Sequence, residues 1–146
     1  MRDGLRLRFE TDGDGTGKLT AGARYCGFAG SGGAWFSISR IDEYAGAIAE
    51  FPLPANKKLL LAGGFWKEGK LSQEHLALEV CQIDSQGHIG IQVRISSELW
   101  PGLRPESQRV ARFEIVTTYE RLRQFSKDLR ELAHGKVEEI LVEAEG

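Results

Sequence analysis

Hydrophobic and polar residues alternate along several short stretches of the chain, and this period of two is typical of half-buried β-strands. The clearest stretch is 89–95, in which isoleucine and valine occupy every second position. The stretch 76–80 alternates in the same way, and a tight reversal at 84–87 joins the two. Gly87 supplies the positive φ that a short hairpin loop needs. The middle of the chain is therefore predicted to form an antiparallel hairpin.

The N-terminal part shows the same alternation at 5–9 and at 19–25, on either side of an Asp- and Gly-rich stretch at 12–17. These two strands are predicted to pair in antiparallel fashion around that turn. Several glycines follow the second strand, at positions 27, 30, 32 and 33. They are expected to end the strand and to form a mobile loop.

Further apolar segments complete the set of predicted strands. Residues 59–61 are expected to form a short buried strand, which the pair of glycines that follows brings to an end. The segment 65–72 is expected to be a polar connection carrying Trp66. Residues 111–115 alternate again, and the acidic tail at 137–142 is a candidate edge strand.

Two segments place apolar residues at the three-and-four spacing of a helical stripe. The first helix is predicted over 40–51, with Ser39 as its N-cap. The second is predicted over 118–134, where residues 117–120 fit a capping box. Gly135 stands where a left-handed C-terminal cap belongs.

Together these elements predict an α+β fold, with a mainly antiparallel sheet of about six strands packed against two helices, the longer one C-terminal. The chain has 146 residues, which is enough to bury one core without disulfides or metals. No internal repeat or boundary divides it, so 1–146 is expected to be a single domain. Within that domain, 137–146 is either an edge strand or a loose tail.

The composition narrows the classes of partner. A formal charge of -2 argues against broad electrostatic capture of nucleic acid or of an anionic membrane, so neither is predicted as a partner. No apolar run is long enough to cross a bilayer, and no apolar stretch follows the N-terminal residues as it would in a signal peptide. The expected compartment is the cytoplasm.

The two cysteines are expected to be small buried hydrophobes. Cys26 and Cys81 each lie in a strand-like run, and neither has a neighbouring Cys or His at a metal-ligand spacing. A disulfide between them is possible only if their strands are neighbours.

None of the candidate motifs for catalysis or cofactor binding has the residue spacing that its chemistry requires. The stretch 12–17 resembles the start of an EF-hand loop, but the twelfth position, which must be a bidentate glutamate, is Ala23. The glycines before Lys18 lack the flanking residues of a P-loop. Metal-ligand spacing is also missing from the three histidines, His75, His88 and His134. Neither a cofactor nor a metal is predicted.

The three tryptophans are the residues most suggestive of function. Trp35, Trp66 and Trp100 lie in predicted loops or at strand ends, beside glycine or proline. Exposed tryptophans are frequent anchors of protein interfaces, whereas buried ones would close the end of the sheet core. The predicted partner-binding residues are Trp66, Glu68 and Trp100.

The second half of the chain is similar to small bacterial immunity proteins of the WapI-like kind and to related uncharacterised bacterial domains. The resemblance spans about 24–135 and lies in hydrophobic and turn positions. Its carriers are the hairpin 76–80, 84–87 and 89–95, the strand 113–115, the helix that Thr118 opens, and the first helix with Phe51 before a proline. The resemblance implies a compact antiparallel sheet packed by a long helix. It also implies a cytoplasmic protein that binds and neutralises a cognate toxin domain, with no catalytic residues to transfer.

These observations favour a non-enzymatic protein-binding module of the immunity type, in which a preformed surface masks the partner's active cleft. An alternative is a small-ligand carrier or enzyme with a pocket between the sheet and a helix. That pocket would bring together several of five residues, Tyr25, Glu50, His75, His88 and Arg94. A third hypothesis is a purely structural homo-oligomer.

Overall fold

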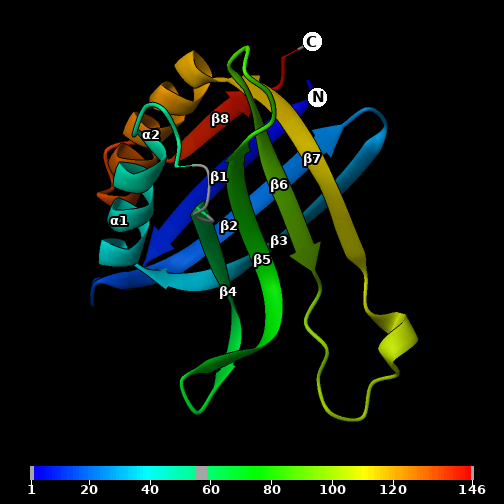
Figure 1. The fold of residues 1–146 in the computed structure, drawn as a ribbon. Helices are drawn as coiled ribbons and strands as arrows, with labels where there is room; N and C mark the ends of the chain where they lie inside the picture. Colours follow the sequence, from blue (N-terminus) through cyan, green and yellow to red (C-terminus); the bar gives the residue numbers. More distant parts are fainter. Residues whose placement is uncertain (1, 55–58, 146) are drawn as a thin grey trace.

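The computed structural model describes residues 2–54 and 59–145, which form two four-stranded antiparallel sheets and two α-helices (Figure 1). In chain order the elements are β1 (Gly4–Thr11), β2 (Thr16–Tyr25), β3 (Phe28–Ser37), α1 (Ile38–Ile48), β4 (Leu59–Lys67), β5 (Lys70–Gln82), β6 (His88–Ser96), the short 3-10 helix η1 (Pro105–Ser107), β7 (Val110–Thr118), α2 (Tyr119–Ala133) and β8 (Glu139–Glu143). The predicted α+β class with antiparallel strands is confirmed. The prediction of a single sheet of about six strands is wrong, because the described residues form eight strands that divide between two sheets.

The first sheet has the strand order β3-β2-β1-β8 and the second has the order β4-β5-β6-β7. The predicted N-terminal hairpin is confirmed, with Leu7 of β1 opposite Ala21 of β2. The central hairpin is confirmed as well, with Leu78 of β5 opposite Val93 of β6. The tail also forms the predicted edge strand, since β8 pairs with β1.

The glycine-rich segment after β2 is a strand, β3, so the prediction of a mobile loop is wrong. β3 crosses the second sheet and touches each of its four strands. A Cβ added to Gly32 would lie 2.6 Å from the side chain of Ile95, and one added to Gly30 would clash with Ala111. The glycines are therefore required by the close approach of the two sheets, because any larger side chain would push them apart.

β4 continues through its glycines to Lys67, so the predicted end of this strand and the predicted polar connection are also wrong. Gly63 faces the ring of Phe36, where an added Cβ would lie 2.8 Å from the nearest ring carbon. The chain reverses at Glu68 and Gly69, which have φ values of +53° and +77°. Two successive residues with positive φ form the tight hairpin turn that joins β4 to β5.

Both helices lie close to their predicted positions, with shifted caps. Ser37 caps α1 in place of the predicted Ser39, because its hydroxyl accepts the backbone N–H of Arg40 at 3.1 Å. α1 ends at Ile48, before the predicted end. α2 is capped by Thr118, one residue later than the predicted capping box requires. No helix in 2–54 or 59–145 has the length and apolar character that a bilayer crossing demands.

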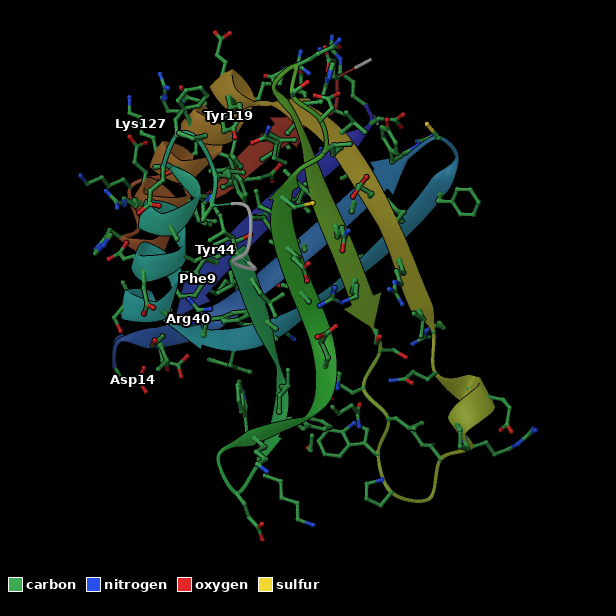
Figure 2. The ribbon with its side chains drawn as sticks, viewed as in Figure 1. Phe9, Asp14, Arg40, Tyr44, Tyr119 and Lys127 are labelled. Atoms are coloured by element: carbon green, nitrogen blue, oxygen red, sulfur yellow. The ribbon has the colours of Figure 1, made fainter. Side chains whose placement is uncertain are left out.

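The two sheets cross face to face, and the helices fill the side on which they diverge (Figure 1). Figure 2 shows Tyr44 reaching from α1 toward the strands, where its hydroxyl donates to the carbonyl of Leu78 at 2.9 Å. The helices contact each other, and the hydroxyl of Ser126 in α2 donates to the carbonyl of Ala45 in α1. Lys127 points from α2 toward solvent. The helices thus close one side of the core, and within 2–54 and 59–145 no α-helix covers the outward face of either sheet.

Both cysteines are free thiols in this fold. Cys81 is half-buried on β5, whereas Cys26 is exposed in the turn after β2, with a φ of +50°. The predicted burial of Cys26 is therefore wrong, because the residue belongs to a turn that lies outside the core. β2 and β5 also belong to different sheets, so the two cysteines do not lie on neighbouring strands.

Candidate binding groove

An open groove of about 540 Å³ lies where the end of β3, the start of α1 and the β4–β5 hairpin meet. We call it the tryptophan groove. Its lining includes Trp35, Arg40, Leu60, Ala62, Trp66 and Leu71. Aromatic and aliphatic side chains dominate this set, and Arg40 is the charged member. A concave, mostly apolar surface with a single charged group is the usual composition of a binding site.

Two tryptophans are exposed at this groove, Trp35 because of strand alternation and Trp66 because it lies near the end of β4. Ala34 and Phe36 of β3 point into the core, so Trp35 between them points outward and is 53% exposed. Trp66 lies near the end of β4, opposite Leu71 of β5, and is 58% exposed. Apolar side chains that gather in one exposed patch, unlike single ones, are a common mark of an interaction surface.

Arg40 enters the groove from the first turn of α1. Figure 2 shows it at the base of the helix, beside β4. Its guanidinium donates to the backbone carbonyl of Leu60 at 2.6 Å. The guanidinium therefore carries a permanent positive charge to the rim of an apolar groove, at a position that the helix N-cap at Ser37 defines.

The structure places the three predicted partner-binding residues around one hairpin, and only Trp66 lines the groove. Glu68 is exposed at the tip of the β4–β5 hairpin, two residues beyond Trp66. Trp100 belongs to the loop after β6 and packs on Phe65, with 4.8 Å between the ring centroids. Trp66 is instead brought together with Trp35 and Arg40.

Sequence reasoning missed Arg40 and the edge of β4. Trp35 was recognisable as a candidate, but nothing local connects it to Trp66. Two features of the sequence could have indicated the groove. Arg40 follows Trp35 closely in the chain. Leu60 and Ala62 share the outward face of β4 if that strand is extended past its glycines.

His75 is buried beneath the β4–β5 hairpin, and its ring contacts Phe65 and Gln73. The residue is buried, its ring lies 4.5 Å from that of Phe65, and its Nε2 is 2.6 Å from Oε1 of Gln73. The amide of Gln73 also bonds both backbone groups of Leu99. Since Oε1 of Gln73 accepts from Leu99, His75 must donate through a protonated Nε2. Burial lowers the pKa of His75, so the neutral ring is favoured.

A layer of charged side chains covers the outward face of the second sheet. Arg94 pairs with Glu74 at 2.9 Å and with Glu79 at 3.4 Å, and the bond to Glu74 raises the pKa of the guanidinium. Burial raises the pKa of the nearby Cys81 thiol, with Glu114 acting in the same direction. A thiol with a raised pKa is a poor nucleophile at neutral pH.

Three residues of the alternative ligand pocket, His75, His88 and Arg94, are each bonded to different partners. His88 pairs with Asp84 at 2.7 Å and with Glu145 at 3.3 Å, while Arg94 belongs to the charged layer described above. His75 is bonded to a third, separate partner, Gln73. The described residues also contain no group of three or more His, Cys, Asp or Glu side chains arranged to hold a metal ion.

Comparison of the chain with protein-family models, with curated proteins and with solved structures finds no match.

Proposed function

We propose that this protein is a non-enzymatic binding module that neutralises a cognate toxin domain, in the manner of bacterial immunity proteins. The observation that carries the proposal is the meeting of Trp35, Arg40 and Trp66 in one groove. Tryptophan and arginine are the residues most enriched at the energetic centres of protein interfaces. The WapI-like pattern of the second half supports the choice of a toxin domain as partner, with the cytoplasm as the place of action.

The groove suits this role because its walls are parts of the folded core. β3, α1 and β4 each bury one face, so their outward side chains are held in place before a partner arrives. A preformed surface spares the partner much of the entropy cost of ordering side chains. Occupation of the partner's cleft by this surface would block its activity without any chemistry on the part of the module.

The proposed contact extends from the groove over the hairpin tip. A standard interface buries about 800 Å² on each partner, which is more than the groove alone offers. Trp66 is the proposed central anchor, and Glu68 lies at the rim beside it. Trp100, 54% exposed and resting on Phe65, is the proposed second aromatic contact.

The experiment is to mix the protein with toxin domains encoded beside its gene and to measure co-elution and loss of toxicity. Trp66→Ala should weaken both effects, with a Kd about thirtyfold higher, because it removes the proposed anchor from an otherwise intact surface. Phe28→Ala is the matched control, since Phe28 is 70% exposed and lies outside the groove. The proposal fails if no such domain co-elutes and none is inhibited.

A further inference from the structure

The free edge of β4 forms one wall of the tryptophan groove. β4 is the first strand of its sheet, and in the described part of the chain only β5 pairs with it. The carbonyl of Leu60 accepts from Arg40 on α1, which lies beyond that free edge (Figure 2). Residues two apart in a strand present their backbone groups on the same side. Leu60 and Ala62 therefore both direct N–H and C=O groups toward the groove.

This edge has little of the protection that natural edge strands usually carry. Such strands commonly place a lysine, a proline or a bulge where another strand could pair. Between Leu59 and Gly63 the side chains of β4 are leucine and alanine, and the register shifts begin only after Gly63. Among the described residues, the hydrogen bond that reaches the backbone of this edge from outside the sheet comes from the side chain of Arg40, and α1 packs beside it.

One positive side chain, Arg40, lies at the open edge, and two more, Lys67 and Lys70, flank the acidic Glu68 at the end of the hairpin. Arg40 is the charged residue among those lining the groove. Lys67 and Lys70 stand directly opposite each other at the end of the hairpin, and no ion pair joins either to a carboxylate of the described residues. Directly opposed like charges destabilise a strand pair. An acidic partner would relieve this repulsion.

We infer that the groove takes an extended acidic segment of the partner protein, which adds as a strand to the free edge of β4. The inference rests on the proposed function and names the kind of segment that the partner must supply. Arg40 leaves the carbonyl of Leu60 and forms a charge-assisted pair with a carboxylate of the segment. The carbonyl is then free to accept a backbone N–H of the added strand, while Trp35 and Trp66 cover its side chains.

The test uses blocked peptides of alternating valine and threonine, titrated at millimolar concentration into the isotope-labelled protein and followed by NMR. One peptide carries a central glutamate, a second carries lysine there, and a third is the glutamate peptide with N-methylated backbone. The glutamate peptide should shift the amide signals of Leu60 and Ala62 and the indole signal of Trp66. The other two should bind at least about tenfold more weakly, because each lacks one of the two proposed interactions.

Charge reversal provides the matched variant. Arg40→Glu should reverse the preference, so that the lysine peptide binds more tightly than the glutamate peptide. Arg112→Glu is the control, since Arg112 is exposed on β7 at the opposite edge of the same sheet and should leave the preference unchanged. Dispersed NMR spectra of both variants would show that they are folded.

The inference is overturned if the glutamate peptide leaves Leu60 and Ala62 unshifted, or if N-methylation does not weaken its binding. Neither result depends on finding the natural partner. The proposed function fails by a different result, when toxin domains neither co-elute with the protein nor are inhibited by it. If a toxin domain binds the Arg40→Glu variant with the same affinity as the unmodified protein, the proposed function is kept. The inference of an added acidic strand is then rejected.

Discussion

β7 and β4 are the two edges of the second sheet, and among the described residues backbone hydrogen bonds from outside the sheet reach β7 but not β4. The backbone N–H of Glu145 donates to the carbonyl of Val116 at 2.8 Å, and the carbonyl of Glu143 accepts from the hydroxyl of Thr117 at 3.4 Å. At β4 the corresponding position is taken by one side chain, Arg40. A backbone cover is held by the strand that carries it, whereas a side chain is displaced at low cost.

Because its cover is a side chain and not backbone, the β4 edge is the one at which a partner strand could pair. The C-terminal residues reach β7 because β8 is anchored beside β1 in the first sheet. The tip of β4 instead projects past the first sheet together with its hairpin (Figure 1). Each edge ends in an exposed apolar residue, Val110 on β7 and Trp66 on β4. The following predictions separate the two edges.

The largest effect should come from loosening the anchor of the covered edge. Ile140 of β8 is 6% exposed, so Ile140→Ala should lower the free energy of unfolding by about 3 kcal/mol through lost burial and the cavity left behind. Leu141→Ala is the matched control, because its side chain is 56% exposed and should cost less than about 0.5 kcal/mol. Urea unfolding measures both. Equal losses would contradict the assignment of β8 as an anchor.

The open edge should respond in binding and not in stability. Trp66→Ala should weaken the complex with a toxin domain by about 2 kcal/mol, or about thirtyfold in Kd, as expected for a hot-spot tryptophan. Val110→Ala, the equivalent change at the covered edge, should leave the Kd unaltered. Isothermal titration calorimetry gives both values. If Val110→Ala weakened binding more than Trp66→Ala does, the partner would bind at the β7 edge and the proposal would be contradicted.

A smaller effect should appear as a pH dependence at the support of the open edge. Burial lowers the pKa of His75, while the nearby Glu98 acts in the opposite direction. His75 therefore takes up a proton more readily in the unfolded chain than in the folded one. The contribution of this residue to the free energy of unfolding is constant above about pH 6.5 and decreases as the pH falls below that value. The free energy of unfolding, measured from pH 7.5 down to 5, should fall less steeply in His75→Gln than in the unmodified protein. Parallel profiles would contradict the assigned role.

The smallest effect is expected from the side-chain contact between His88 and Glu145 at the C-terminal cover. The two side chains are 36% and 43% exposed, so solvent weakens their interaction. Glu145→Ala should change the free energy of unfolding by less than about 0.5 kcal/mol, because the backbone bond to Val116 remains. Urea unfolding checks this value. A loss as large as that of Ile140→Ala would show that this side-chain contact holds the cover in place.

Most strands were predictable because each buries one face, which leaves an alternation that reads directly from the chain. The stretches at 5–9, 19–25, 76–80 and 89–95 were found in this way. β3 was missed because its inward positions include Gly30 and Gly32, which give no hydrophobic signal. These positions must be small because they pack against Ile95 and Ala111, which lie more than sixty positions away in the chain.

The candidate site was predictable only in part. Trp66 and Trp100 were recognisable as large aromatic residues outside any alternating core pattern. Their separation into a groove residue and a residue packed on Phe65 depends on the β4–β5 hairpin, which the sequence pattern did not predict. Arg40 gave no signal as a groove residue, because its contact is with a carbonyl twenty positions later in the chain.

The sequence by itself determined both helices and most of the strands, with the face that each of these buries, because alternation and helical spacing are local properties. Only the tertiary structure decided that the strands form two sheets, that β7 is covered and that β4 is open. Whether an edge has a neighbour depends on where distant segments come to rest. Backbone groups are identical at every residue, so no residue type records that Leu60 and Ala62 face an open groove.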